Sequence, residues 1–385
     1  MHHAGHSGAC LGCLLPLASS AVNGAPDDAA LRYTSRHEFD LRSGTNDMTR
    51  VTVVIVNYNG GETLLRCLSA LVQQTSRPDI IVVDNASADD SLAQIARQHP
   101  AVQVIPLRRN SGFARGFNIG VSRIDADDGI VVALNPDTLP SADFIERLTA
   151  PFANQPKVGS VAGTLTFSSN PKVIASAGIV VHRNGVALDA RVGEALGSLP
   201  AVESQPVFGP SGGAAAYRLR VFREVGGFCE PFFLYLEDVD LAWRMRFAGH
   251  ESVWVPAAKA RHDYSASAGE GSALKRRLIA RNRIWTLVRC LPVEIWRRDR
   301  AAILTTDALA STYGLATLDP ALWGRLAALP LLAPRLRERC VIQGQARVSW
   351  EAIDQWLQPP VSPRRLRELR QLTGNLANQS THDKR

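Results

Sequence analysis

Two acidic positions of the chain stand directly after apolar runs that have the composition of buried strands. Asp84 follows Ile80–Val83, and the triplet Asn135-Pro136-Asp137 follows Ile130–Leu134. Runs of about four to six residues rich in Val, Ile and Leu indicate strands that are buried on both faces. Ligands of an open parallel sheet bind beyond the carboxyl ends of its strands. Asp84 can therefore accept a hydrogen bond from a ribose hydroxyl or a base N–H, and the alternative is a turn aspartate that caps the next helix.

Asp137 is a candidate metal ligand. The triplet Asn135-Pro136-Asp137 has the form of an Asp-x-Asp metal motif whose first acid is replaced by Asn135. Divalent metals such as Mg²⁺ take few protein carboxylates and complete their shell with phosphate oxygens, so one Asp and a diphosphate are sufficient. The alternative is a proline turn after a strand. His262 can add a neutral imidazole to the metal, although a lone His is more often structural.

The segment Glu237-Asp238-Val239-Asp240 is dense in carboxylates. It follows the run Phe232–Leu236, which is apolar enough to predict a third buried strand from which the acids emerge. Like charges at this spacing raise at least one pKa when the site is partly buried. A carboxylate with a raised pKa suits a general base that acts on a sugar hydroxyl. The alternative is the acidic first turn of an ordinary helix, predicted over 237–248.

Three glycines recur at every fourth residue. Gly112, Gly116 and Gly120 lie on one helix face and allow a helix, predicted over Arg115–Ile124, to pack closely on a sheet. The GxGxxG dinucleotide fingerprint is absent from this segment. Arg115 and the helix N-terminus can meet a diphosphate. The alternative is a tightly packed helix with a solvated arginine.

These residues require a parallel sheet to bring them together. Apolar runs of strand length alternate with segments of helical periodicity, which predicts an α/β fold with right-handed crossovers. The predicted strands are 51–56, 80–83, 102–106 and 130–134, with helices at 62–74, 89–98 and 115–124 between them. After a predicted helix over 142–152, shorter strands are expected in a smaller, partly antiparallel unit at 159–167, 174–181 and 209–217.

The order and spacing of the motifs resemble those of inverting glycosyltransferases of family 2, and most closely the rhamnosyltransferase-like enzymes of bacterial cell-surface glycan assembly. The resemblance covers about Val51 to Pro292. It rests on 54–59 (VIVNYN), 82–87 (VVDNAS), 110–118 (NSGFARGFN), 135–137 (NPD), 212–213 (GG), 226–228 (GGF) and 232–241 (FFLYLEDVDL). Cys229 stands where an Asp commonly follows the Gly-Gly-Phe motif, at a position that is expected to be structural.

The resemblance implies a GT-A fold, a mostly parallel Rossmann-like sheet flanked by helices, and a nucleotide-diphospho-sugar donor. It implies that Asp238 is the base, with Glu237 beside it, and that Asp137 and His262 bind Mg²⁺ or Mn²⁺. The donor would contact a set of residues drawn from five motifs: Tyr58, Asn59, Asp84, Arg115, Asn135, Gly212 and Gly213.

By this resemblance, the expected reaction transfers a deoxyhexose such as rhamnose from a dTDP donor to a glycan or a lipid-linked acceptor. No nucleic-acid partner is expected. One alternative is another sugar, such as galactofuranose or a hexose from a UDP donor. A second is an inactive GT-A module that binds a nucleotide sugar or a glycan without turnover. Retention of Asp137, Glu237 and Asp238 argues against inactivity.

The chain has 385 residues with a formal charge of +7, and its charge divides it into regions. Residues 1–47 lack a pattern and are expected to be a disordered extension, with Met48 as a candidate start. Residues 48–273 form the transferase domain, and 274–385 form a basic helical region. The stretch 275–300 has nine Lys or Arg against two acids, interleaved with Trp and Leu. This pattern predicts a helix on an anionic membrane surface, and the alternative is a helix packed on the catalytic domain.

The remaining sequence features concern location and redox state. No apolar stretch reaches the roughly 18 residues of a spanning helix, so a cytoplasmic protein is expected, free or peripheral on the inner face of the membrane. Apart from Cys10-x-x-Cys13, the six cysteines have no ligand-like spacing, which favours reduced thiols. Cys10 and Cys13 with His2, His3 and His6 make only an incomplete zinc set.

Overall fold

A computed structural model describes residues 50–199, 201–263 and 271–382, with side chains to Ala377. The predicted extension 1–47, the candidate start at Met48 and the Cys10–Cys13 pair lie outside these residues. The described cysteines, Cys67, Cys229, Cys290 and Cys340, are free thiols, as expected.

A mixed, mostly parallel sheet with the order β10-β12-β6-β11-β4-β1-β2-β3 forms the centre of the described chain. The predicted crossovers are confirmed, because β1 runs parallel to β2 and β4, and β2 runs parallel to β3. Strand β11 is antiparallel to β4 and to β6, which gives the partly antiparallel second half. The strands are β1 (Val51–Asn57), β2 (Asp79–Asp84), β3 (Gln103–Pro106), β4 (Ile130–Leu134), β5 (Thr138–Pro140), β6 (Val158–Phe167), β7 (Ile174–Ser176), β8 (Ile179–Val181), β9 (Ala187–Asp189), β10 (Gln205–Pro206), β11 (Ala214–Arg218) and β12 (Glu251–His262).

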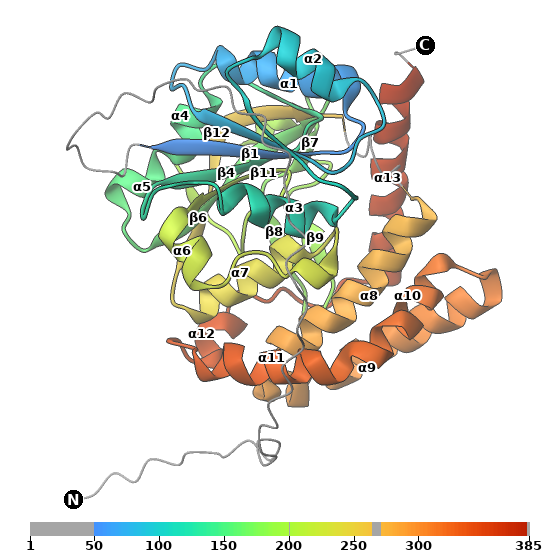
Figure 1. The fold of residues 1–385 in the computed structure, drawn as a ribbon. Coiled ribbons are helices and arrows are strands. Elements are labelled where there is room, and N and C mark those ends of the chain that lie inside the picture. Colours follow the sequence, from blue (N-terminus) through green and yellow to red (C-terminus); the bar gives the residue numbers. More distant parts are fainter. Residues whose placement is uncertain (1–49, 200, 264–270, 383–385) are drawn as a thin grey trace, which may run out of the picture. The chain divides into compact units, whose positions relative to one another are not determined.

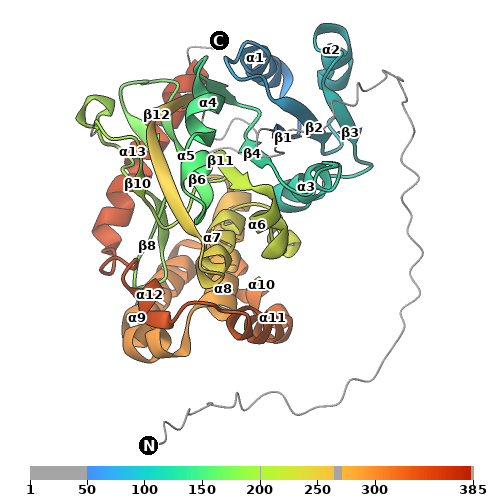
Figure 2. The ribbon, with the colours of Figure 1, turned by 90° about the vertical axis from the view of Figure 1, so that its left-hand side faces the viewer.

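Helices cover both faces of this sheet, as Figures 1 and 2 show. Val53 and Ile55 of β1 pack with α1 on one face, whereas Val54 and Val56 pack with α3 and α7 on the other. This alternation is the two-residue period of a strand that is buried on both faces. The helices are α1 (Gly61–Val72), α2 (Ser91–Gln98), α3 (Gly112–Val121), α4 (Phe144–Thr149), α5 (Pro151–Asn154), α6 (Leu219–Glu224), α7 (Glu237–Phe247), α8 (Ala273–Cys290), α9 (Val293–Thr317), α10 (Pro320–Ala328), α11 (Leu332–Gly344), α12 (Trp350–Asp354) and α13 (Pro363–His382).

The glycine face of α3 packs on β1, as its spacing predicts. A Cβ at Gly116 would lie 2.8 Å from the Val56 side chain, and one at Gly120 would lie 2.4 Å from Val54. Such contacts are closer than real Cβ atoms tolerate, so only glycine allows this approach. The helix begins at Gly112, earlier than the predicted Arg115.

Three predicted elements are divided or shortened at residues that interrupt their hydrogen bonding. The predicted helix 142–152 becomes α4 and α5, separated at Ala150 because Pro151 cannot donate a backbone hydrogen bond. The predicted strand 174–181 becomes β7 and β8, which are separated by Gly178 in a left-handed conformation. The predicted strand 209–217 begins only at Ala214, so Gly212 and Gly213 lie in the turn before β11.

The prediction of a strand over Phe232–Leu236 is wrong. This segment is a 3-10 turn followed by a loop in which Phe233, Tyr235 and Leu236 have positive φ. The buried amide of Asn282, on α8, donates to the carbonyls of Phe232, Leu234 and Tyr235 at 2.7–3.0 Å. Because a side chain satisfies these carbonyls, the run needs no neighbouring strand, and it is buried at Phe232 and partly buried over 233–236. Glu237 and Asp238 thus follow a partly buried loop in place of a buried strand.

The basic stretch 275–300 does not form the predicted surface helix. It breaks between α8 and α9 at Leu291 and Pro292, and Trp285 and Ile295 are buried. Arg283 and Arg289 are buried as well, in ion pairs with Asp307 and Asp240. The stretch therefore packs on the rest of the protein. Within the described ranges, we find no helix long and apolar enough to cross a membrane.

Candidate active site

The turns that follow β1 and β2 form the first half of the site. Asp84 is buried, and its carboxylate accepts hydrogen bonds from the Asn57 amide at 2.8 Å and the Ser87 hydroxyl at 2.6 Å. The Ser87 oxygen also accepts from the backbone N–H of Asn59 at 2.9 Å. Asp84 therefore holds the two turns together, as in the turn-aspartate alternative, at the edge where a nucleoside is expected to bind.

Two other predicted donor-binding residues lie on the same edge of the sheet. Tyr58 is exposed at the tip of the β1–α1 turn, where an aromatic ring can stack on a base. Arg115 is half-exposed on the first turn of α3, with Glu230 3.8 Å from its guanidinium. The N-terminus of α3 is tied to the end of β2, because Asn85 bonds the backbone of Ser111 and Gly112.

Asp137 and His262, the two predicted metal ligands, are brought together. Strand β12 ends at His262, which pairs with Thr138 in the antiparallel β5–β12 ladder. His262 Nε2 consequently lies 3.0 Å from Asp137 Oδ1, and the Asn135 amide lies 3.3 Å from the same nitrogen. Two neighbouring ligands of an octahedral Mg²⁺, each about 2.1 Å from the metal, are also about 3 Å apart. The pair therefore fits a divalent cation whose other ligands are phosphate and water oxygens.

The electrostatics of this pair also favour a cation. Burial alone lowers the pKa of His262, but the charge of Asp137 and its hydrogen bond raise it above the usual value. The carboxylate thus attracts positive charge at a site that is almost closed to solvent. No cluster of three or more acidic, His or Cys ligands occurs in the described chain. A metal here would therefore depend on the donor for the rest of its shell.

The Gly212–Gly213 turn connects the metal pair to Asp238. The backbone N–H of Gly212 donates to Asp238 Oδ2 at 2.9 Å, while the Gly213 carbonyl accepts from the backbone N–H of Asn135 at 3.2 Å. A Cβ at Gly213 would meet the Asn135 amide at 3.4 Å and the His262 ring at 3.9 Å. The turn thus brings the first turn of α7 beside the end of β4.

Asp238 and Glu237 have the properties of an acid–base pair. Asp238 is partly exposed, and burial raises its pKa to about 6, while hydrogen bonds from Gly212 and Val239 limit the rise. Glu237 is buried, and burial together with the charge of Asp238 raises its pKa well above the usual value. With a pKa of about 6, Asp238 is mostly ionised at neutral pH and is accessible, which is the state that a general base requires.

Comparison with known proteins identifies the family. Residues 52–226 match the profile of glycosyl transferase family 2. The chain is 30% identical over 242 residues to the N-acetylglucosaminyl-diphospho-decaprenol L-rhamnosyltransferase of Mycobacterium tuberculosis, an alignment that covers 57% of this chain and 78% of the relative. The chain belongs to the family 2 glycosyltransferases. It is also similar to the O-antigen chain rhamnosyltransferase RfbN of Salmonella typhimurium, at 29% identity over 56% of this chain and 67% of the relative.

A solved structure shares the fold of this family 2 glycosyltransferase. GalNAc-T7, determined with UDP, GalNAc and Mn²⁺, superposes with a TM-score of 0.52 at 17% identity. The match covers 66% of this chain and about half (52%) of the GalNAc-T7 chain. At this identity the match supports the GT-A architecture alone, as the sequence predicts.

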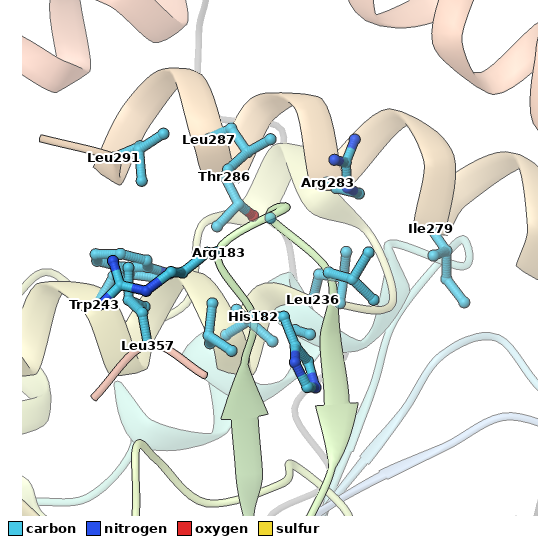
Figure 3. A pocket seen from close by; sticks show the side chains of 15 residues that line it. His182, Arg183, Leu236, Trp243, Ile279, Arg283, Thr286, Leu287, Leu291 and Leu357 are labelled. Atoms are coloured by element: carbon cyan, nitrogen blue, oxygen red, sulfur yellow. The ribbon is translucent and has the colours of Figure 1, made fainter. Parts of the chain in front are cut away.

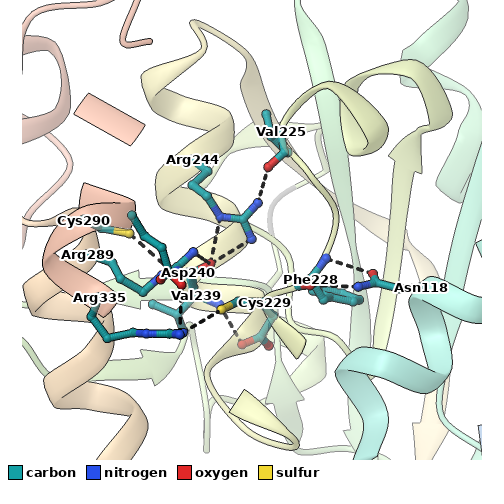
Figure 4. Close-up of polar contacts among 12 residues, drawn as sticks. Asn118, Val225, Phe228, Cys229, Val239, Asp240, Arg244, Arg289, Cys290 and Arg335 are labelled. Carbon is teal, nitrogen blue, oxygen red and sulfur yellow. Dashed lines mark hydrogen bonds and ion pairs between the residues drawn. The ribbon is translucent and has the colours of Figure 1, made fainter. Parts of the chain in front are cut away.

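The glycosyltransferase uses the other side of α7 for structure. Asp240 is fully buried, and its carboxylate lies 2.8 Å from Arg244 and 2.6 Å from Arg289 of α8 (Figure 4). Burial would raise the pKa of Asp240, but the two arginines hold it below its usual value. The cluster extends to α11, where Glu338 pairs with Arg289 and with Arg335. It fixes the helix that carries Asp238 to the C-terminal helices.

Two cavities adjoin elements that carry the site. An apolar cavity of about 60 Å³ is enclosed by the β8–β9 hairpin, α7 and α8, with Leu236, Trp243 and Leu287 in its wall (Figure 3). It is too small for a sugar, which needs several hundred Å³ with its nucleotide. A polar cavity of about 210 Å³ adjoins Asp137 and is lined by Arg66 and Arg261.

Sequence reasoning missed three of the charged residues around the site. Arg66 on α1 and Arg261 on β12 flank Asp137, where they can meet phosphate oxygens. Asp189, at the end of β9, adds negative charge that raises the pKa of both Asp238 and His262. The acid lies on a three-residue strand without a pattern, and nothing in the sequence marks it. For Arg261, the signal that the sequence did offer was its position directly before His262.

Proposed function

We propose that this glycosyltransferase moves a deoxyhexose such as rhamnose from a nucleotide-diphosphate donor to a glycan or lipid-linked acceptor, with inversion and with a divalent metal. One observation carries the proposal. The Gly212–Gly213 turn connects Asp238, a carboxylate with a pKa of about 6, to the Asp137–His262 pair. A base and a site for a diphosphate are the two groups that a single displacement at an anomeric carbon needs.

Asp238 accepts the proton of the acceptor hydroxyl as the oxygen attacks the anomeric carbon. The new bond forms on the face opposite the bond to the diphosphate, which breaks with its electron pair, so the configuration inverts. The hydrogen bonds from Gly212 and Val239 keep the carboxylate in place. Burial and the charge of Asp238 raise the pKa of Glu237, which disfavours a second negative charge beside Asp238.

Asp137 and His262 would hold the metal, and Asn135 would fix the imidazole beside it. When bound, Mg²⁺ or Mn²⁺ neutralises the negative charge that builds on the departing diphosphate, an effect worth several kcal/mol. Arg66 and Arg261, which line the cavity beside Asp137, and Arg115 on α3 would add to this neutralisation. The turns at Tyr58–Asn59 and Asp84 would hold the nucleoside on the same edge.

The choice of sugar rests on the relatives. The mycobacterial and Salmonella relatives are rhamnosyltransferases by name, and the first acts on a diphospho-decaprenol-linked N-acetylglucosamine. They support rhamnose as the donor sugar, a lipid-linked glycan as the acceptor and a role in cell-surface polysaccharide synthesis. A UDP donor with galactofuranose or a hexose is the competing choice, since specificity depends on contacts that need a bound sugar.

A donor screen with the purified protein tests the proposal. The substrates are dTDP-rhamnose, UDP-galactofuranose and UDP-hexoses, each with a polyprenyl-diphosphate N-acetylglucosamine acceptor, and the readout is nucleoside diphosphate released only when acceptor is present. We expect release with dTDP-rhamnose and an inverted anomeric centre in the product by NMR. Binding of a donor by calorimetry without release from any of them would overturn the proposal in favour of an inactive binding module.

A further inference from the structure

The C-terminal half of α9 and the following α10 form a hairpin with an exposed apolar surface, which lies at the right of Figure 1. Exposure is highest near the turn, at 69% for Leu315, 76% for Leu318 and 58% for Trp323. We call this set the hairpin tip. Further exposed apolar side chains continue from it along both helices and beyond: Leu304, Leu309, Tyr313, Leu326, Leu329 and Leu331. Exposed apolar side chains that gather in one region of a protein mark a site of interaction.

Charge is almost absent from this surface. Between Ala308 and Pro334, the chain has only Asp319 and Arg325 as charged residues. Asp319 is buried and pairs with Arg276, and Arg325 lies 3.5 Å from Asp307. Both charges are therefore satisfied within the helical region. The hairpin tip presents apolar and aromatic groups alone.

The helical region that carries this uncharged surface is strongly basic. Residues 271–344 contain 13 Lys or Arg and five Asp or Glu, a net charge of +8 in a chain of net charge +7. Arg297, Arg300 and Leu304 follow helical spacing and lie exposed on one face of α9. Arg337 adds an exposed charge on α11. The apolar tip thus has a positive border.

We propose that the hairpin tip docks on the surface of an anionic lipid bilayer. Leucines at the tip can enter the acyl boundary, while Trp323 and Tyr313 suit the headgroup region because each ring has an apolar body and a polar edge. The arginine border matches anionic headgroups. A second copy of the chain fits less well, because a two-fold contact through the tip would bring two strongly basic borders together.

The docking surface differs from the one that the sequence predicts. The sequence placed it on 275–300, whose Trp285, Arg283 and Arg289 are buried instead. The basic charge of that stretch still contributes through its exposed members, Arg297 and Arg300. The apolar part comes from the segment that follows them.

Flotation with vesicles tests the proposal. The full chain is mixed with neutral vesicles of phosphatidylcholine, or with vesicles that also contain phosphatidylglycerol. We expect flotation with the anionic vesicles, reduced by roughly tenfold or more in L315S/L318S, because two exposed apolar side chains are lost. The matched control is V72S/V202S, which changes two exposed apolar residues away from the hairpin and should float like the wild type. R297E/R300E should lose the preference for anionic lipid.

Three results would overturn docking by the tip. One is equal flotation of L315S/L318S and wild type. Another is equal binding to neutral and anionic vesicles. The third is a lipid-free dimer, seen by light scattering, that L315S/L318S converts to monomer, since this would assign the tip to a second copy. Circular dichroism melting of each variant verifies folding. Flotation does not involve sugar transfer, so its outcome is independent of the proposed reaction.

Discussion

Asp238 and Asp240 are two residues apart on the first turn of α7, yet their surroundings are opposite. Asp240 is fully buried between Arg244 and Arg289, and its pKa is held below the usual value. Asp238 is partly exposed, accepts hydrogen bonds from the backbone N–H groups of Gly212 and Val239, and has a pKa raised to about 6. One carboxylate is neutralised by the fold, whereas the other keeps its affinity for a proton.

The difference shows how one helix can serve structure and chemistry together. The arginine side fixes α7 to α8 and α11, which keeps the opposite side in place against the Gly212–Gly213 turn. A basic carboxylate is destabilising for the fold, because burial penalises its charge. The paired side of the helix offsets this cost.

Removal of metal is the change with the largest expected effect. It should affect the transfer reaction and leave the stability that depends on Asp240 unchanged. In the proposed reaction a metal would neutralise the negative charge at Asp137, whereas that at Asp240 is neutralised by arginines. We expect EDTA to abolish transfer, Mg²⁺ or Mn²⁺ to restore it, and Asp137→Ala to remove both the activity and its metal dependence. The melting temperature should stay the same in EDTA.

Full activity in chelator would contradict the metal assignment. Arg66, Arg261 and Arg115 would then carry the leaving group alone.

Asp240→Asn should weaken the ion pairs that fix α7 to the C-terminal helices. The variant keeps the shape of the side chain but leaves Arg244 buried without a counter-charge and Arg289 with Glu338 alone, which costs on the order of 3–5 kcal/mol of unfolding free energy. Urea denaturation measures it. The matched control is Asp143→Asn, whose partner Arg147 is half-exposed on α4, so a loss below about 0.5 kcal/mol is expected. Similar losses of unfolding free energy in the two variants would contradict a special structural role for Asp240.

The pH dependence of stability should have opposite signs for the two carboxylates. Asp240 has a lowered pKa in the folded state, so its stabilisation is present above its unfolded pKa and is lost as pH falls through the folded value. Asp238 has a raised pKa, so the stability associated with its protonated form is lost as pH rises from about 4 to about 6.

We therefore expect the unfolding free energy of Asp238→Asn to rise relative to that of the wild type as pH increases across that interval. The rise should be on the order of 1 kcal/mol for each tenfold difference between the acid dissociation constants of Asp238 in the folded and unfolded states. Urea denaturation at pH 4.5 and pH 7 measures the gain. A difference between variant and wild type that does not change with pH would mean that Asp238 has an ordinary pKa.

The sequence predicted the parts of the fold that depend on local patterns. The alternation of apolar runs and helical segments located β1 to β4 and the helices between them, because β1, β2 and β4 are largely buried on both faces, whereas β3 is a partly exposed edge strand. The strand predicted over Phe232–Leu236 failed because the backbone of this segment is satisfied by Asn282, about fifty residues later. No local pattern reports such a partner.

In the candidate site, too, local motifs could be predicted from the sequence, whereas long-range contacts could not. Asp137, Asp238 and His262 stand in motifs, so the sequence could nominate each of them. That Asp137 and His262 lie 3.0 Å apart depends on the antiparallel pairing of β5 with β12. The arginines of 275–300 were placed on a surface because their acidic partners are distant: Asp240 precedes the stretch, and Asp307 and Glu338 follow it. Long-range ion pairs decide burial here.

The most direct measurement is the transfer rate of Asp238→Asn at saturating donor and acceptor, with donor affinity measured by calorimetry on the same sample. The substitution keeps the hydrogen-bonding shape and removes the basicity. If Asp238 is the base, turnover should fall by about 10² to 10⁴ while donor affinity is largely kept. Turnover above about a third of the wild-type rate would contradict the account, because the proton would then be leaving to another group.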